Sequence, residues 1–191
     1  MDDVAASLLS GTKPGLAGAF SSGSPEQTAA LGSALGEQLG PGDVVGVVGE
    51  LGAGKTVFVK GVAAGLGIDP DAVTSPTFTL VHTHQGRCRL FHLDLYRIER
   101  PEAVEGIGWD ETVGGRGVAV VEWADRAAAW LPADRLEVHL AMTGETARRI
   151  EIAAFGERPR AHLGALLAKP FWASRRLPET MARGTEHRGE R

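Results

Sequence analysis

The sequence predicts an α/β fold: a mostly parallel central sheet, helices flanking it, and antiparallel hairpins at the edge. Two apolar runs without alternation, 44–48 and 118–122, are typical of strands buried on both faces of a parallel sheet. The segment 24–39 starts with Ser-Pro and then repeats leucine every four residues, which indicates an amphipathic helix. Alternating residues over 77–94 and 135–155 indicate two hairpins.

The remaining elements follow from local patterns along the chain. Glycine and proline at 40–42 end the first helix, and a second helix begins at Lys55 after a glycine-rich loop. A proline followed by acids opens a short helix near residue 101. The predicted order is a short strand near 16–20, helix 24–39, strand 44–48, a helix from 55 that ends at 65 or 67, hairpin 77–94, a short helix over 101–109, strand 118–122, hairpin 135–155 at a sheet edge, and helix 158–169.

Length and charge indicate one folded domain with two less ordered ends. A chain of 191 residues, 43% hydrophobic and 23% charged, fits a single globular unit. We expect a flexible leader over 1–23, a folded domain over 24–169 and a disordered basic tail over 170–191. Such a tail could contact RNA or an acidic partner, but a solvated tail is the favoured interpretation. The net charge of −4 argues against general nucleic-acid binding by the whole chain.

Cysteine usage and hydropathy favour a reducing compartment away from membranes. Cys88 is the single cysteine, so an intrachain disulfide is excluded. The start of the chain carries acids where a signal peptide carries bases. No stretch approaches the about 18–20 apolar residues of a membrane span. We therefore expect a cytoplasmic protein.

The stretch after the first buried strand has the composition of a phosphate-binding loop. Residues 49–56 read GELGAGKT and fill every fixed position of the pattern G-x-x-x-x-G-K-[ST]. Bare glycines let backbone N–H groups approach a phosphate chain, and the following helix directs its positive end at the anion. Lys55 can reach the outer phosphates, and the Thr56 hydroxyl can ligate Mg²⁺. The residues predicted to contact the nucleotide here are Glu50, Leu51, Gly52, Ala53, Gly54, Lys55 and Thr56.

Two acidic residues end predicted apolar strands: Asp94 in RLFHLD and Glu122 in VAVVE. A nucleoside triphosphate site of this kind needs a carboxylate that holds the metal, directly or through water. Four small apolar residues before the acid favour Glu122 as the metal-side acid, together with Thr56. Asp94 would assist the metal shell or orient the attacking water, although the two roles could be exchanged. The predicted catalytic residues are therefore Lys55, Asp94 and Glu122.

A hydroxyl-rich loop precedes the first hairpin. In TSPTFTLV, Pro76 stiffens a loop that carries the hydroxyls of Thr74, Ser75 and Thr77. A loop in this position could sense the γ-phosphate as a switch segment does, with Thr77 as its contact. A simple hydroxyl turn that leads into a strand is an equally good interpretation.

The sequence bounds the identity of the base only indirectly. Guanine-specific proteins with this loop usually present an N-K-x-D segment, which is absent here, so adenine and hence ATP are favoured. The start of the first helix, near Glu26 and Thr28, is the candidate for contact with the base.

Other chemistry-bearing residues have simpler explanations. His82 and His84 share a strand face, but a metal site needs more ligands. Trp123 is interpreted as a packing residue in preference to a platform for the base. Arg97 could pair with Asp94 or contact the transferred phosphate.

Four ordered segments between residues 24 and 155 resemble the TsaE (also called YjeE) family. They are GELGAGKT, TSPTFTLV, HLDLYR and VVEWAD. The resemblance implies a compact P-loop NTPase-like domain that hydrolyses ATP with Mg²⁺. It also implies two protein partners, TsaB and TsaD, and a role in the threonylcarbamoyl modification of the adenosine beside the anticodon of tRNA. In that family, tRNA is reached indirectly, through the complex in which TsaD transfers the threonylcarbamoyl group.

Two other classes of function remain open at this stage. One is a small-molecule kinase on the same fold, although no arginine-bearing lid is evident in the sequence. The other is a module that binds nucleotide without hydrolysing it, against which the two strand-end acids argue.

Overall fold

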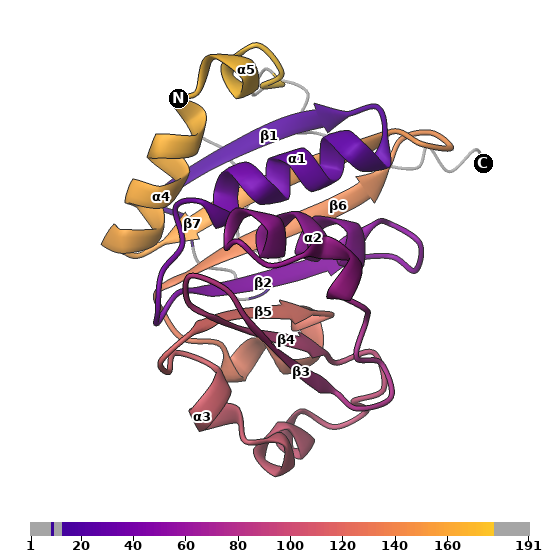
Figure 1. The fold of residues 1–191 in the computed structure, drawn as a ribbon, viewed down its shortest axis with the longest axis vertical. Coiled ribbons are helices and arrows are strands. Elements are labelled where there is room, and N and C mark those ends of the chain that lie inside the picture. The colour runs from indigo at the N-terminus through magenta and orange to yellow at the C-terminus, as the bar shows by residue number, and fades with distance from the viewer. Residues whose placement is uncertain (1–8, 10–12, 178–191) are drawn as a thin grey trace, which may run out of the picture.

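The computed structural model describes residue 9 and residues 13–177, and seven strands of these residues form one sheet (Figure 1). The strands are β1 (Leu16–Ser22), β2 (Val44–Gly49), β3 (Val81–Gln85), β4 (Arg89–Asp94), β5 (Val118–Glu122), β6 (Arg135–Met142) and β7 (Arg148–Phe155). The helices are α1 (Pro25–Gly36), α2 (Lys55–Gly65), α3 (Trp109–Thr112), α4 (Glu157–Leu167) and α5 (Pro170–Ala173). Short 3-10 helices are η1 (Pro70–Ala72), η2 (Pro101–Ile107) and η3 (Ala124–Trp130).

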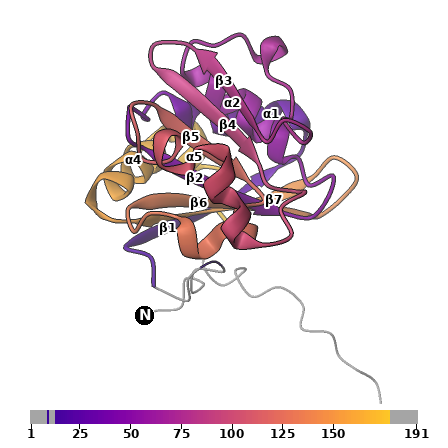
Figure 2. The ribbon, with the colours of Figure 1, turned by 90° about the horizontal axis from the view of Figure 1, so that it is seen from below.

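The sheet has a parallel centre and antiparallel flanks, which confirms the predicted fold class. Its order is β1-β7-β6-β2-β5-β4-β3, so β1 and β3 lie at opposite edges (Figures 1 and 2). The central strands β6, β2, β5 and β4 are parallel, whereas β3 pairs antiparallel with β4, and β7 with both β6 and β1. Parallel strands have their carboxyl ends on the same side of the sheet. The residues that follow β2, β4 and β5 are therefore brought together there.

The second hairpin lies one strand inside the edge, because β1 pairs along the whole of β7. Strand β1 was expected over 16–20 within the leader and extends to Ser22. At the other end of the chain, α5 packs Trp172 edge-on against Phe20, with ring centroids 6.2 Å apart. Residues 175–177 then bond to β1, with Leu177 N–H donating to Ala19 O at 2.8 Å.

The folded unit is therefore longer than the domain expected over 24–169, because it includes β1 at its start and α5 at its end. Both terminal segments contain apolar side chains, such as Phe20 and Trp172, that are buried against each other. The rest of the predicted leader and tail (1–8, 10–12 and 178–191) lies outside the described residues.

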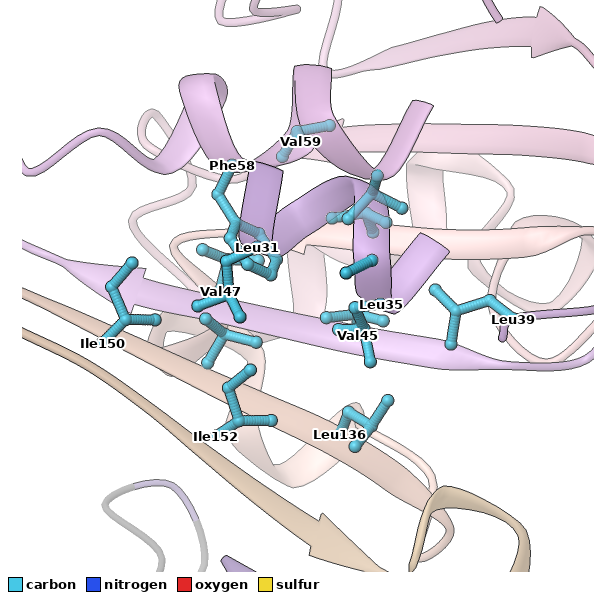
Figure 3. Close-up of a cluster of buried hydrophobic side chains, with 14 of the residues drawn as sticks. Leu31, Leu35, Leu39, Val45, Val47, Phe58, Val59, Leu136, Ile150 and Ile152 are labelled. Atoms are coloured by element: carbon cyan, nitrogen blue, oxygen red, sulfur yellow. The ribbon is translucent and has the colours of Figure 1, made fainter. Parts of the chain in front are cut away.

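Helices α1 and α2 cover one face of the sheet side by side and carry its main core (Figures 1 and 3). Figure 3 shows Leu31 and Leu35 of α1 directed at Val45 and Val47 of β2. These side chains are fully buried or nearly so, as the leucine repeat predicts. A second cluster on the opposite face is built around Trp109 and holds η2, α3 and η3. The two clusters bury both faces of β2 and β5. The residues at the ends of these strands are therefore held in a fixed position.

Glycine at the contact between α1 and α2 lets the two backbones approach closely. A Cβ at Gly61 would lie 2.0 Å from the carbonyl oxygen of Ala29. We expect Gly61→Ala to destabilise the protein by about 3 kcal/mol or more, because the overlap is with backbone that cannot rotate away. Gly164→Ala in α4 is the matched control, since its Cβ would meet nothing within 4 Å. Thermal unfolding should show Gly164→Ala unchanged or stabilised by about 0.5–1 kcal/mol; equal behaviour of the two variants would contradict this account.

Candidate functional site

The loop between β2 and α2 has the backbone that its glycines predict. Gly52 and Gly54 have φ values of +79° and +99°, in the left-handed region that favours glycine. A Cβ built at Gly52 would have nothing within 4 Å, so the space in front of the loop is open. Gly54 is the N-cap of α2. Bare backbone, open space and a helix N-terminus together fit an anion such as a phosphate group.

Lys55 is the first residue of α2, and its side chain is folded back onto the loop. Its Nζ donates to the carbonyl oxygens of Gly49 at 2.7 Å and Glu50 at 2.8 Å. The same ammonium lies 3.7 Å from the centroid of the Trp123 ring, a cation–π geometry. Burial lowers the pKa of the Lys55 ammonium, and the carboxylates of Glu122 and Asp94 partly oppose that shift. The lysine is therefore a sequestered cation held between the loop and the end of β5.

Thr56 and Glu122 are hydrogen-bonded to each other, although 66 residues separate them in the sequence. The Thr56 hydroxyl donates to Glu122 Oε2 at 3.1 Å. The other carboxylate oxygen, Oε1, lies 2.8 Å from Nε2 of His92, which is fully buried. A hydroxyl beside a carboxylate is a pair of hard oxygen donors, the kind that Mg²⁺ prefers. The metal-side pair predicted from the sequence is thus assembled by α2 and β5.

Asp94 stands beside Glu122, because the two are register partners in the neighbouring parallel strands β4 and β5. Its Oδ2 accepts hydrogen bonds from the hydroxyls of Ser75 and of Thr77, the latter at 2.7 Å. Its Oδ1 accepts from the backbone N–H of Tyr96 at 2.9 Å. The hydroxyl-rich loop therefore closes directly onto the second acid of the site.

Two non-glycine residues with positive φ flank this region. Leu80, with φ of +66°, ends the hydroxyl-rich loop, and its carbonyl accepts from the N–H of Asp94 at 3.0 Å. Trp123, with φ of +58°, directly follows Glu122. This conformation is unfavourable for side chains of this size, and residues that adopt it cluster at functional sites.

Several sequence-based assignments change with the structure. Thr28 is 2% exposed, and its hydroxyl lies 2.8 Å from Ser22 Oγ, so a base could not reach it in this conformation. Thr28 is therefore not the base contact that its place at the start of the helix suggested. The guanidinium of Arg97 lies 4.3 Å from the ring of the exposed Phe78, rather than at Asp94. Trp123, expected to pack, packs against the ammonium of Lys55.

Two further residues, His92 and Arg148, support the site and were not predicted from the sequence. His92 precedes Asp94 by two positions, so strand alternation alone places both side chains on one face, but only the fold shows the contact with Glu122. Arg148 opens β7 and donates to two carbonyls of the glycine loop. No local pattern signals that role, because 95 residues separate Arg148 from Ala53.

Strand, glycine loop and helix, with acids at the ends of two adjacent parallel strands, define the fold of a P-loop NTPase. Residues 22–150 match the family described as "Threonylcarbamoyl adenosine biosynthesis protein TsaE". The chain belongs to the TsaE family.

Individual relatives agree with that assignment. The protein named "tRNA threonylcarbamoyladenosine biosynthesis protein TsaE" in Treponema pallidum is 44% identical over 130 residues, 68% of this chain and 96% of that protein. The protein of the same name in Bacillus subtilis is 42% identical over 135 residues, 70% of this chain and 84% of its own length. The crystal structure of Bacillus subtilis YdiB superposes with a TM-score of 0.67 at 35% identity, covering 79% of this chain and 94% of YdiB.

Within residue 9 and residues 13–177, no helix combines the length and the apolar character needed to cross a bilayer.

Proposed function

We propose that this protein is a Mg²⁺-dependent ATPase that serves the biosynthesis of threonylcarbamoyladenosine in tRNA. The observation that carries the proposal is that four residues meet at the carboxyl ends of the central strands: Lys55, Thr56, Asp94 and Glu122. The relatives' names support the pathway, and the loop geometry supports the nucleotide. The proposal includes a cytoplasmic location, where tRNA would be the substrate of the assembled machinery.

In this proposal the loop from Glu50 to Thr56 holds the triphosphate through its backbone N–H groups. Lys55 would leave the carbonyls of Gly49 and Glu50 and place its ammonium against the β- and γ-phosphates. Because the triphosphate replaces two neutral acceptors, the exchange favours the bound state. Leu51 is 72% exposed at the tip of the loop and would cover the phosphates from the solvent side.

Thr56 and Glu122 would hold Mg²⁺, either directly or through water. When bound, Mg²⁺ would neutralise negative charge on the β- and γ-phosphates as the terminal phosphate is transferred. His92 donates from Nε2 to Glu122 Oε1 and thereby directs the other carboxylate oxygen toward Thr56. Replacement of Thr56 or Glu122 should raise the Mg²⁺ concentration that activity requires.

Asp94 would orient the attacking water and accept a hydrogen bond from it at a carboxylate oxygen. In the present conformation Oδ2 is satisfied by Ser75 and Thr77. Thr77 would exchange this contact for the γ-phosphate when ATP binds, which leaves Ser75 on Oδ2 and frees one acceptor position of that oxygen for water. The hydroxyl-rich loop would then act as a switch segment that distinguishes ATP from ADP.

Thr77→Val tests the switch. The variant keeps the shape of the side chain but loses the hydroxyl, so we expect turnover of ATP to fall about tenfold or more. Binding of ADP, which has no γ-phosphate, should stay unchanged in calorimetry. Thr79→Val, in the same loop but bonded only to the carbonyl of Pro76 at 3.5 Å, is the matched control. An equal loss of ATP and ADP binding in Thr77→Val would show that Thr77 only supports the fold.

The partners TsaB and TsaD belong to this proposal as well. The site lies at the carboxyl ends of the central strands, and Phe78 of the neighbouring hydroxyl-rich loop is 83% exposed. A partner could therefore contact the segments that surround the nucleotide. The test is release of phosphate from ATP by the purified protein, alone and with TsaB and TsaD together. We expect slow hydrolysis that the two proteins accelerate. A rate that does not respond to them would count against the assignment to their complex.

A further inference from the structure

Arg148, the first residue of β7, ties the glycine loop to the turn between β6 and β7. Its Nε donates to the carbonyl of Ala53 at 2.8 Å, and Nη2 donates to the carbonyl of Gly52 at 3.2 Å. Both acceptors belong to the loop that carries the phosphate-binding pattern.

The remaining nitrogen of the guanidinium holds the turn itself. Nη1 lies within hydrogen-bond distance of the carbonyls of Gly144 at 3.1 Å, Glu145 at 3.2 Å and Ala147 at 2.8 Å. A guanidinium is planar, permanently charged and rigid, so its two sides keep a fixed spacing. The turn and the glycine loop are therefore held at a fixed distance by one side chain.

This contact sets the direction of a peptide group at the phosphate site. In a trans peptide the C=O and the next N–H point in opposite directions. Because the carbonyl of Ala53 is held toward Arg148, the N–H of Gly54 points away from Arg148. The charge of Arg148 also polarises that peptide and makes its N–H a stronger donor.

We propose that Arg148 is a positioning residue for nucleotide binding, which presets the glycine loop to receive the phosphates. The inference rests on the proposed binding of ATP by this loop. It also connects the exposed turn over 143–147 to the glycine loop, so that a change in the conformation of the turn would change the conformation of the loop. Thr146 extends the connection, since its hydroxyl donates at 2.9 Å to the carbonyl of Gly23, just before α1.

The test compares Arg148→Met with Arg149→Met by calorimetry and steady-state kinetics. Arg149 is the matched control, because the next residue of the strand projects to the opposite face and pairs with Glu151 at 2.6 Å. For Arg148→Met we expect the Kd of ATP, ADP and inorganic pyrophosphate to rise about tenfold, as the loss of charge-assisted bonds predicts. The KM for ATP should rise in parallel while kcat changes less than about twofold, since Asp94 and Glu122 lie on other strands. Arg149→Met should bind as the wild type does.

The outcomes separate this inference from the proposed function. Wild-type protein that fails to bind ATP removes the proposed function, and the inference with it. Wild-type protein that binds ATP, together with Arg148→Met that binds equally well or loses only kcat, overturns the inference alone. If Arg148→Met does not fold, Arg148→Lys decides in its place, because a single ammonium cannot hold both the loop and the turn. Lysine should give weaker binding than the wild type, and unchanged binding would overturn the inference.

Discussion

Lys55→Ala is expected to abolish measurable binding of ATP, raising its Kd by about a hundredfold or more. The substitution removes the cation that would meet the β- and γ-phosphates. It also removes the side chain that Gly49, Glu50 and Trp123 hold ready beside the site. Calorimetric titration with ATP and Mg²⁺ measures the effect directly.

Lys60→Ala is the control for this prediction, because Lys60 lies on the same helix, outside the glycine loop. It should bind ATP as the wild type does. The melting temperature of each variant without nucleotide shows whether it is folded. A folded Lys55→Ala protein with wild-type affinity would mean that the nucleotide, if any, binds elsewhere.

Asp94→Asn carries the second large effect: turnover should fall about a thousandfold, within the range that general base catalysis and water positioning supply. Asparagine keeps the size of the side chain, its amide oxygen can still accept from the backbone N–H of Tyr96, and its NH2 group can donate to the Thr77 hydroxyl, so the fold should be preserved. ATP affinity should change only a few-fold, because the loop and Lys55 remain. Single-turnover hydrolysis of bound ATP is the measurement, with the exposed Asp110→Asn as control.

Glu122→Gln resolves which of the two acids serves the metal. Glu122 bonds to Thr56, so we expect its replacement to raise the Mg²⁺ concentration needed for half-maximal activity by about tenfold or more. Asp94→Asn should leave that concentration unchanged while lowering the rate. The reverse pattern in a Mg²⁺ titration would exchange the two roles.

Much of the fold could be predicted because local signals and tertiary structure agree. The unbroken apolar runs at β2 and β5 required burial on both faces, and the leucine repeat of α1 required a sheet beneath it. The position of the second hairpin inside the sheet could not be predicted in this way. It depends on the pairing of β1 with β7, because the local pattern near 16–20 predicts a strand but does not specify its partner.

The candidate site was predictable where one motif supplied several groups, and unpredictable where distant segments meet. Residues 49–56 specify their own geometry through glycine and the helix that follows. The contacts of His92, Trp123 and Arg148 depend on strand register and on one left-handed residue, neither of which a local pattern encodes. Thr28 lies one turn before Leu31 on the same face of α1, so the leucine repeat itself places Thr28 on the face that the sheet covers.

Single-turnover incubation of γ-labelled ATP and Mg²⁺ with excess purified protein tests the central claim most directly. The account predicts that the wild-type protein releases the label as inorganic phosphate and leaves ADP, that omission of Mg²⁺ stops the release, and that Lys55→Ala releases none. Intact ATP after prolonged incubation with folded wild-type protein, or equal release by Lys55→Ala, would contradict it.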